Sequence, residues 1–479
     1  MGHVLGAKEV SEGSLPSQYA VNAGWVLVDG PNGPDLSRDA VLIIADGKVA
    51  AIEAGDFAHS LPVLDASHHL VLPGFISAHT HTIAGLPTRG IIEAGRPYMR
   101  PLELLDGLDD DELDALTAAN LAEIVRSGGT SQLEMSLSRR HAESYVRIAR
   151  DWGVRGYPSV MSPPNKGLAR IWFRDQDVVL ENAAGEIIAG IDEGAGFAEW
   201  ALEAGGDLIT PMMAAHATDT QTPETLKHLK AAIDRLGLDL HIHIAQRFTE
   251  RDAVQRMWGV SPVQFLEREG LLNGKVFGAH MTAVDWKSDS QTLIDRGVVY
   301  AHCPSAGGAG VSTQPYPEAL YYGVPAAIGL DTHSNDCLEN IKLAVIKGRV
   351  RAAAKMDAGH TDVRIPTIKD GIASSSRVTA NGLGRDDLGR LRVGARADFV
   401  AVDICGPLVG SGALPPEPLN NLLYANGTAV RHVAIDGALK VVDGIFASAD
   451  EYAVRRRAAQ VMEKIWARLD QEKWFQTHN

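Results

Sequence analysis

The chain has 479 residues, and its 60 acidic side chains outnumber its 45 lysines and arginines, which gives a net charge of −15. So acidic a chain is poorly suited to binding nucleic acid. A composition of 45% hydrophobic and 22% charged residues is that of an ordinary globular protein and excludes disorder as the main state. The sequence has no run of about 18 apolar residues, so we expect no insertion into a membrane.

The cysteines and the start of the sequence bear on the compartment. Cys303, Cys337 and Cys405 are widely spaced and form no CxxC motif, so neither a disulfide framework nor a thiolate zinc site is expected. The first six residues have neither the basic flank nor the apolar run of a signal peptide. We therefore expect a cytoplasmic protein.

From residue 19 to residue 72, short β-rich runs alternate with clusters of turn residues. The runs at 26–28, 41–44 and 49–52 are separated by clusters that contain glycine and aspartate, in the first case also proline and asparagine. This pattern predicts antiparallel hairpins.

After Pro73 and Gly74, strand-like apolar runs alternate with amphipathic segments of helical length, up to about residue 385. The clearest are helices predicted at Asp109–Ser127 and Pro223–Leu236, and strands predicted at Ser131–Met135 and Leu238–Ile244. Thr222 suits the N-cap of the second helix. The alternation predicts a parallel sheet wrapped by helices.

Beyond residue 389 the pattern returns to strands, at 398–403, 430–435 and 439–442. The two chain ends therefore look like halves of one small β-domain. Apolar residues at helical spacing in 449–474 predict a final helix, packed on its own protein or, alternatively, in a dimer contact. The expected segments are 1–72 and 386–448 for the β-domain, 73–385 for the α/β region and 449–479 for the helix.

Two histidine pairs end strand-like runs. His79 and His81 open the α/β region, and His241 and His243 lie further along. Side chains alternate along a strand, so the two imidazoles of each pair face the same way and can share one ion. A single HxH pair is a weak signal with a high false-positive rate, and seen alone it indicates two partly buried, hydrogen-bonded histidines rather than a metal site. Two pairs at two strand ends favour a metal site.

Three further polar residues, His280, His302 and Asp331, each end an apolar run of strand length. Singly, His302 reads as a core imidazole and Asp331 as a helix N-cap or turn residue. Jointly, three or four imidazoles and one carboxylate form a site that suits zinc, iron or cobalt and leaves room for water.

The sequence resembles the amidohydrolase superfamily, specifically the metal-dependent aminohydrolases that include guanine, cytosine and methylthioadenosine deaminases and the triazine hydrolases. The resemblance is carried by the leading strands, Leu72–Phe75, the His79/His81 pair, Val393–Phe399 and Asn426–Gly427. It implies an α/β fold, a distorted (β/α)8 TIM barrel with a small β-sandwich domain formed by both chain ends. It also implies a small-molecule substrate and a homodimer or higher homo-oligomer.

The resemblance also implies roles for single residues. The implied metal ligands are His79, His81, His243 and Asp331, with His280 either a further ligand or a substrate contact. His216 falls where relatives carry a substrate-facing histidine. For His302, substrate contact and structural packing both stay open.

The sequence departs from this family at two places. Relatives that deaminate heterocycles usually carry a glutamate where this chain has Gln246, and an amide can orient a substrate but cannot act as general acid or base. Glu250 is a poor substitute, because relatives often have an acidic residue near there outside the site. The expected end of the fourth strand, 208–213, has no lysine to bridge two metals, so one metal is expected. In the loop 82–100, Arg89 either meets an anionic substrate group or forms a surface salt bridge.

These observations predict a mononuclear metal-dependent amidohydrolase that cleaves a non-peptide C–N bond in a small amide, urea, carbamate or cyclic substrate by activating water. Zinc is the expected ion, with iron and cobalt as alternatives. Asp331 is the predicted general base, His280 polarises the substrate and Gln246 orients it. A deaminase of a purine-, pyrimidine- or triazine-like ring is the alternative enzyme. A non-catalytic scaffold or a lyase on the same fold are the alternatives of other classes.

Overall fold

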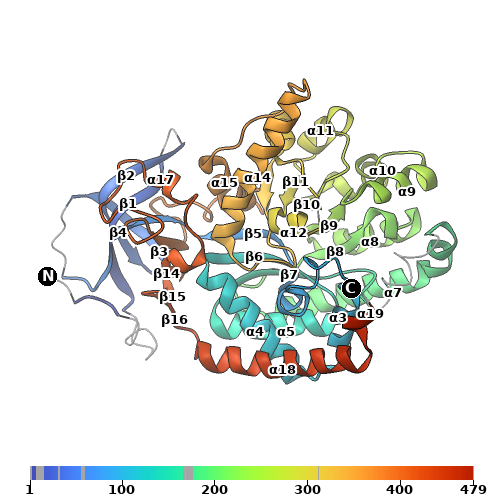
Figure 1. The fold of residues 1–479 in the computed structure, drawn as a ribbon, viewed down its shortest axis with the longest axis horizontal. Coiled ribbons are helices and arrows are strands. Elements are labelled where there is room, and N and C mark those ends of the chain that lie inside the picture. Colours follow the sequence, from blue (N-terminus) through green and yellow to red (C-terminus); the bar gives the residue numbers. More distant parts are fainter. Residues whose placement is uncertain are drawn as a thin grey trace.

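The structure is a computed structural model that describes residues 3–6, 16–30, 33–55, 60–165, 168, 176–310 and 312–477. In these ranges both ends of the chain contribute to one sheet, and the middle of the chain forms parallel strands covered by helices (Figure 1). No helix within them has the length and apolar character needed to cross a membrane.

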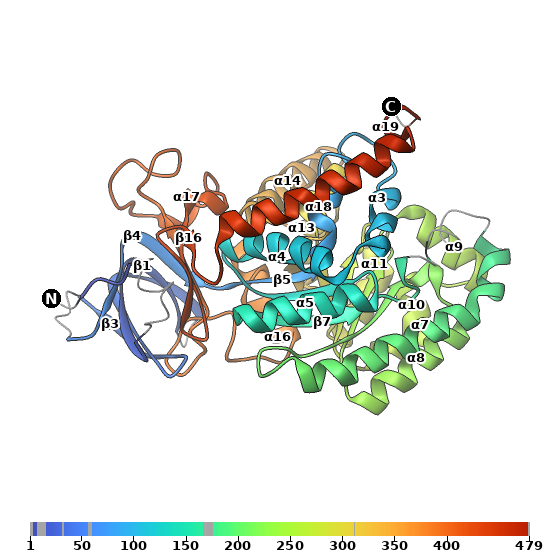
Figure 2. The same cartoon turned by 90° about the horizontal axis from the view of Figure 1, so that it is seen from below.

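One eight-stranded sheet joins the two chain ends, in the order β16-β15-β14-β13-β4-β1-β2-β3. Its first half consists of β1 (Gln18–Gly30), β2 (Gly33–Ala45), β3 (Lys48–Ala54) and β4 (Val63–Pro73). Its second half consists of β13 (Phe399–Asp403), β14 (Val430–Ile435), β15 (Ala438–Val442) and β16 (Ile445–Phe446). Strands β13 and β4 pair antiparallel, and in both views the blue and the red-brown strands lie side by side (Figures 1 and 2).

The middle of the chain forms two parallel sheets. The three-stranded sheet contains β5 (Phe75–Thr80), β6 (Gly129–Ser136) and β7 (Arg155–Val160). The five-stranded sheet contains β8 (Met213–Ala217), β9 (Leu240–Ile244), β10 (Val276–His280), β11 (Val299–His302) and β12 (Ala326–Ile328). Isolated parallel bridges join both edge strands of the three-stranded sheet to segments beside the five-stranded sheet: Thr80 on β5 to Asp331, just after β12, and Gly156 on β7 to Ile209, just before β8. The predicted α/β fold with parallel strands is thus confirmed.

Helices follow these strands along the chain. Up to the last parallel strand they are α2 (Gly85–Thr88), α3 (Met99–Glu103), α4 (Asp110–Arg126), α5 (Arg139–Trp152), α7 (Gln176–Ala204), α8 (Pro223–Leu236), α9 (Phe248–Trp258), α10 (Pro262–Arg268), α11 (Trp286–Asp295), α12 (Pro304–Ala309) and α13 (Tyr316–Tyr322). Beyond it are α14 (Cys337–Asp357), α15 (Ile368–Ser374), α16 (Arg377–Gly382), α17 (Pro418–Asn421), α18 (Glu451–Gln471) and α19 (Trp474–Thr477). Short 3-10 helices lie at Thr82–Ala84, Leu104–Gly107, Thr218–Thr220, Leu271–Asn273 and Gly427–Ala429.

The clearest helix predictions match the structure because their ends carry strong local signals. Asp109 caps α4 by accepting a hydrogen bond from the backbone N–H of Glu112, and the Glu112 side chain in turn accepts one from the backbone N–H of Asp109. Thr222 caps α8 through the N–H of Thr225, and Pro223 occupies the first helical position. Gly237 ends α8 in the left-handed conformation that glycine adopts at low cost.

The last long helix, α18, packs lengthwise against α4 (Figure 2). The buried face that the spacing predicted consists of Ala458, Val461, Met462, Ile465 and Leu469. These side chains join a core cluster with α3 and α4. The helix therefore covers its own protein, as expected.

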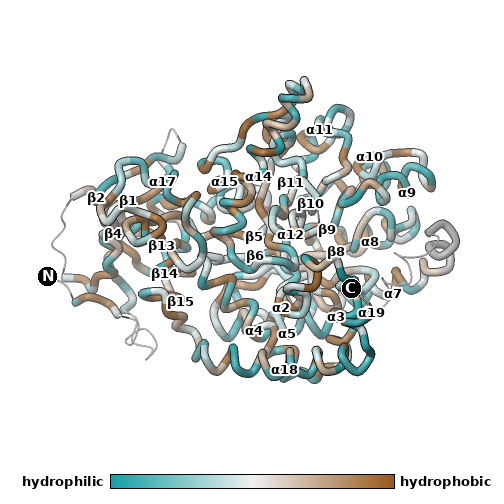
Figure 3. Tube along the Cα trace, in the orientation of Figure 1, coloured by the Kyte–Doolittle hydropathy of each residue, from teal (hydrophilic) through white to brown (hydrophobic). Residues whose placement is uncertain are grey.

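Apolar residues follow the strands of both sheet regions, whereas the outward faces of the surrounding helices are largely hydrophilic (Figure 3). A buried ion-pair network ties the two regions together. Arg155 on β7 lies 2.6 Å from a carboxylate oxygen of Asp436 and 3.2 Å from one of Asp398, both beside the eight-stranded sheet. Removal of one partner would leave an uncompensated buried charge and so would destabilise the contact between the sheet and the α/β region.

Candidate metal centre and cavity

The candidate site lies at the carboxyl ends of the parallel strands. His79 is the fifth residue of β5, and His81 follows that strand; His243 is on β9 and His280 ends β10. Asp331 comes three residues after β12 and is bridged to Thr80. Parallel strands present the same end to one rim, so segments far apart in sequence bring their side chains together there.

Five predicted side chains converge. The Nε2 atoms of His79 and His243 are 3.2 Å apart, and Asp331 Oδ1 lies 3.9 Å from His79 Nε2 and 3.8 Å from His81 Nε2. His280 Nε2 is 3.7 Å from Asp331 Oδ2. Two overlapping groups, His79-His81-His243 and His79-His280-Asp331, each keep their ligand atoms within 4.8 Å of one another.

Neighbouring groups orient two of these imidazoles. His81 Nδ1 donates to the carbonyl of Met135 at 2.6 Å, and His243 Nδ1 donates to the carbonyl of His216. A neutral imidazole that donates through Nδ1 keeps a lone pair on Nε2, the atom that faces the site. Metal-binding histidines are held in this way in known proteins.

The third imidazole, that of His79, contacts His241, a histidine outside the predicted ligand set. His79 Nδ1 lies 2.8 Å from His241 Nε2, and His241 is fully buried. His241 Nδ1 has no hydrogen-bond partner among the described residues. With an ion on His79 Nε2, the His79 proton would sit on Nδ1 and be donated to His241. The second HxH pair thus supplies one inward-facing imidazole and one supporting imidazole.

Burial keeps these rings in the form that binds metals. Removal from water, and then the neighbouring imidazoles, lowers the pKa of His79 and His243 well below the usual value for histidine. Burial also lowers the pKa of His280, against the opposing effect of Asp331. A neutral ring offers a lone pair, so the cluster is prepared for a cation rather than for protons.

The residues present therefore fit a divalent ion. Two nitrogens sharing a tetrahedral zinc at ~2.0–2.1 Å would be about 3.3 Å apart, close to the 3.2 Å between His79 and His243. Three imidazole nitrogens and one carboxylate also match the donor types of zinc, iron and cobalt sites.

The backbone is strained where it presents these residues. Ala245, His280 and Asp331 have φ values of +47°, +75° and +61°, respectively, in a left-handed region that residues with a Cβ seldom adopt. Each costs of order 1–3 kcal/mol and persists only where the surroundings enforce it. Close packing is one such constraint, since a Cβ added at Gly329 would lie 2.9 Å from the Cβ of His79.

A cavity of about 330 Å³ opens over the cluster, within the range of small-molecule sites. Its polar lining includes His81, His216, His243, Gln246, Arg247, His280, Gln314 and Asp331. Its apolar lining includes Ile92, Met99, Leu102, Leu137, Met161 and Leu168, with Tyr98 beside them. Asp331 is the only carboxylate that lines it in the described part of the chain.

Gln246 lines this cavity, whereas Glu250 does not. The Gln246 Nε2 atom is buried without a hydrogen-bond partner among the described residues, so it is available to donate to a ligand. The Glu250 carboxylate accepts backbone hydrogen bonds from Ala245 at 2.9 Å and Gln246 at 2.7 Å, and one from the hydroxyl of Thr218. Glu250 therefore holds the turn that carries Gln246, in agreement with its being a poor substitute for the missing glutamate.

Of the two other histidines predicted to contact substrate, one lines the cavity and one does not. His216 lines the cavity, and its ring centroid is 5.2 Å from that of His243. His302 does not line it; the ring stacks on Tyr316 and its Nδ1 lies 3.0 Å from Gln314 Oε1. This geometry favours the packing interpretation of His302, since another side chain lies between it and the cavity.

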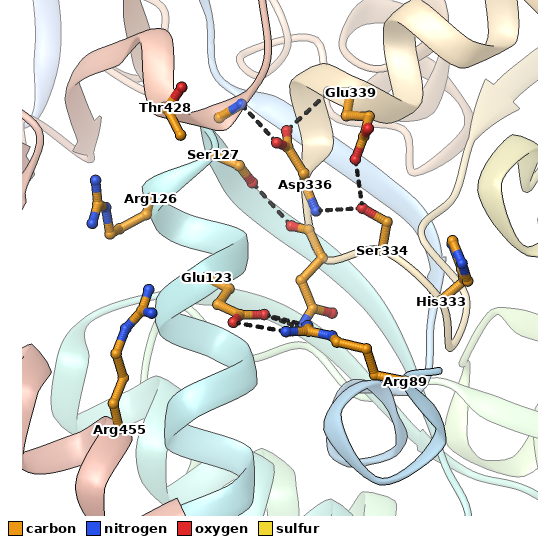
Figure 4. A pocket seen from close by; sticks show the side chains of 12 residues that line it. Arg89, Glu123, Arg126, Ser127, His333, Ser334, Asp336, Glu339, Thr428 and Arg455 are labelled. Carbon is orange, nitrogen blue, oxygen red and sulfur yellow. Dashed lines mark hydrogen bonds and ion pairs between the residues drawn. The ribbon is translucent and has the colours of Figure 1, made fainter. Parts of the chain in front are cut away.

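Arg89 lies outside the cavity. Its guanidinium pairs with Glu123 at 2.7 Å on the wall of a separate pocket of about 400 Å³ between α4, the loop after Asp331 and the first turns of α18 (Figure 4). The charged groups drawn there have partners within the protein: Arg126 and Arg455, for example, both pair with Glu451. The salt-bridge interpretation of Arg89 holds, and the structure gives no support for substrate contact.

The segment expected as the end of the fourth strand was placed too early. The fourth parallel strand, β8, spans Met213–Ala217 rather than 208–213, because the run 208–212 crosses beside β7 through the bridge from Ile209 to Gly156. The corrected strand also contains no lysine. The argument for a single metal is therefore unaffected.

Two neighbours of the cluster, Gln314 and Glu134, were missed from the sequence. Gln314 contacts both His280 and His302. The buried Glu134 on β6 accepts from the backbone N–H of Thr82 at 2.8 Å and so holds the turn after His81. The glutamine follows no strand and the glutamate lies inside one, so neither stands at a position that strand-end reasoning searches.

A model of the amidohydrolase family matches residues 70–440, more than half of the chain. The chain belongs to the amidohydrolase family. Among curated relatives, it is 27% identical over 452 residues to a 5'-deoxyadenosine deaminase of Methanopyrus kandleri, covering 89% of this chain and 94% of the relative. It is 26% identical over 439 residues to a 5-methylthioadenosine/S-adenosylhomocysteine deaminase of Pyrococcus furiosus, covering 88% and 95%.

Solved structures agree on the fold of this amidohydrolase. An adenosine deaminase from Xanthomonas campestris with bound zinc superposes with a TM-score of 0.74 at 21% identity, covering 98% of this chain and all of the other. An atrazine chlorohydrolase from Arthrobacter aurescens in complex with zinc gives a TM-score of 0.78 at 18% identity, covering 93% and 100%. The predicted family and enzyme class, a hydrolase of carbon–nitrogen bonds other than peptide bonds, are confirmed.

Proposed function

We propose that this amidohydrolase uses one divalent ion to hydrolyse a C–N bond in a small amide, urea, carbamate or cyclic substrate. The observation that carries the proposal is the convergence of His79, His81, His243 and Asp331 beneath a cavity of about 330 Å³. His79, His81, His243 and Asp331 would hold the ion, with His280 beside them. Zinc is the ion we favour, since two of the solved relatives bind it.

The ion, when bound, would lower the pKa of a water to about 7 and so supply a nucleophile at neutral pH. Asp331 would accept a proton from the attacking water as the water oxygen bonds to the substrate carbon. The C–N bond would then break, and the same proton would pass from Asp331 to the departing nitrogen. The step is balanced, because one water adds across one C–N bond and Asp331 is returned ionised.

The remaining side chains position the substrate. Gln246, with its unpartnered buried Nε2, would donate a hydrogen bond to a substrate oxygen or ring nitrogen. His280 would polarise the reacting group, and His216 would line the opposite part of the bound molecule. The apolar lining of the cavity supports a substrate that carries an alkyl or aryl group.

The alternative enzyme is a deaminase of a purine-, pyrimidine- or triazine-like ring. Its support is the names of the curated relatives, which are deaminases. Gln246 weighs against it, because an amide cannot relay the proton that ring deamination needs. A lyase or a non-catalytic scaffold on this fold remains the alternative of another class.

We also propose the finer architecture. The two parallel sheets, bridged at both edges, would close into a distorted (β/α)8 barrel at residues 73–385. The small domain, 1–72 with 386–448, would be a β-sandwich, and 449–479 the covering helix. A homodimer or larger assembly and a cytoplasmic location stay predictions that rest on the resemblance and the sequence.

A substrate panel with metal-loaded protein tests the function. N-aryl and N-alkyl ureas, carbamates and amides are compared with aminopurines, cytosine and aminotriazines, and amine release is measured separately from ammonia release. We expect amine release, lost in Asp331→Asn with metal still bound. Ammonia release from rings alone would establish the deaminase, and no turnover on either set with a filled site would favour the scaffold or the lyase.

A further inference from the structure

Gln314 joins His280 to the wall of the cavity. It lies in the loop between α12 and α13, is 7% exposed and lines the cavity beside His280. Its Nε2 atom is 3.2 Å from His280 Nδ1, and its Oε1 atom is 2.7 Å from the backbone nitrogen of Cys303. Both ends of the amide are therefore engaged.

The contact with Cys303 determines which way the amide points. A backbone N–H can only donate, so the atom that it meets must be the carbonyl oxygen of Gln314. The amide nitrogen then faces His280, and because an NH2 group can only donate, His280 Nδ1 must accept. A neutral His280 therefore carries its proton on Nε2, the atom 3.7 Å from Asp331 Oδ2.

His302 agrees with this orientation. Its Nδ1 atom lies 3.0 Å from Gln314 Oε1, so it donates to the same oxygen that accepts from Cys303. The hydroxyl of Tyr300, 3.1 Å from the same Nδ1, can accept from it as well. Its Nε2 atom is then the unprotonated nitrogen, and this atom has no partner among the described residues. The chain from His302 through Gln314 to His280 thus has one consistent set of donors and acceptors.

We infer that Gln314 is a positioning residue that fixes His280 as an Nε2–H hydrogen-bond donor, so that His280 is not a ligand of the ion. An imidazole can bind a metal only through an unprotonated nitrogen, and His280 Nε2 is protonated in this arrangement. Three imidazoles and Asp331 then complete the ligand set, and a position stays open for water. The role of His280 toward substrate rests on the proposed function, whereas its proton position does not.

The chemistry of His280 follows from its proton. A neutral imidazole is too weak an acid to give up its remaining proton, so no proton leaves Nε2 during the reaction. His280 instead donates a hydrogen bond to the substrate oxygen or nitrogen on which negative charge develops. Such a donor partly replaces the missing glutamate at position 246 without acting as an acid, which leaves proton transfer to Asp331.

A glutamate at position 314 would reverse the arrangement. Gln314→Glu keeps the oxygen that accepts from Cys303 and replaces the donating amide nitrogen by a second acceptor. His280 would then place its proton on Nδ1 and turn an Nε2 lone pair toward the ion. The matched control is Gln221→Glu, the same change at a fully buried glutamine that donates to Ser162 and does not line the cavity.

Nitrogen-15 NMR of histidine-labelled, metal-free protein reads the proton position directly, with the His280 signals assigned by their loss in His280→Asn. We expect a protonated Nε2 in the wild type and in Gln221→Glu, and a protonated Nδ1 in Gln314→Glu. A protonated Nδ1 in the wild type, or an unchanged pattern in Gln314→Glu, overturns the inference. Neither readout requires turnover, so failure of the hydrolase proposal would be distinguishable.

Cobalt substitution provides the second readout. We expect Gln314→Glu to gain an imidazole ligand, which raises the coordination number and weakens the visible absorption of bound Co²⁺ relative to the wild type and Gln221→Glu. With a substrate from the panel, kcat should fall by about 100-fold, as for loss of one donor to developing charge, with KM little changed. Identical cobalt spectra in all three proteins would overturn the assignment of His280 as a non-ligand.

Discussion

Replacement of His241 by leucine should weaken metal binding, although His241 is not itself a metal ligand. His241 Nε2 lies 2.8 Å from His79 Nδ1 in a fully buried position. In His241→Leu the Nδ1–H of metal-bound His79 would lose its acceptor, and an unsatisfied buried donor costs about 1–3 kcal/mol. By the conversion of 1.4 kcal/mol per tenfold, the dissociation constant for zinc should rise by about 5- to 140-fold.

Competition with a chromophoric zinc chelator measures this dissociation constant. His241→Gln restores a carbonyl acceptor and should recover part of the affinity. His141→Leu is the matched control, because His141 is equally buried but lies on α5 and does not belong to the candidate metal groups. An unchanged zinc affinity in His241→Leu, with affinity lost in His243→Ala, would refute the reasoning that His241 orients His79.

Three further outcomes are expected. Gln246→Leu should raise KM about 10-fold with a smaller change in kcat, because it removes one hydrogen bond to the substrate; an unchanged KM would show that Gln246 does not touch it. Burial lowers the pKa of His141 to about 3, from 6.5 in the unfolded chain, so the unfolded state binds the extra proton and stability falls as pH drops from about 6.5 toward 3. Urea unfolding between pH 4 and 6 measures how the free energy of unfolding changes with pH. In His141→Phe this slope should be lower than in the wild type by up to about 1.4 kcal/mol per pH unit, whereas equal slopes would contradict burial of a neutral His141. Metal removal by a chelator should lower the melting temperature, since an ion at 100 times its dissociation constant adds about 2.7 kcal/mol; equal melting temperatures would contradict a site formed only in the folded state.

Local signals made much of the fold predictable. The capping residues Asp109 and Thr222 mark the starts of α4 and α8, and the apolar spacing in 449–474 marks the buried face of α18. His79 and Asp331 could be predicted as site residues because each ends an apolar run of sequence, where a polar side chain is conspicuous. The polar residues at the carboxyl ends of the parallel strands can therefore be predicted from short stretches of sequence.

What depends on tertiary contacts was not predictable. Arg89 is as suitable for a ligand as for Glu123 until α4 is placed beside it. Gln314 lies in a loop without periodicity, and its role appears only through the backbone of Cys303. His241 and His243 are equivalent in a two-residue repeat, and only the position of His79 assigns one to the ion and the other to support.

The central claim is that His79, His81 and His243, with Asp331, surround one ion. A crystal structure of the zinc-loaded protein, with diffraction data collected on both sides of the zinc absorption edge, tests it most directly. We predict a single anomalous peak about 2.0–2.1 Å from the Nε2 atoms of the three histidines, with an Asp331 oxygen at about 2.0–2.2 Å. A zinc-soaked crystal with no peak at these residues, or with the ion held by a different set of side chains, would contradict the account.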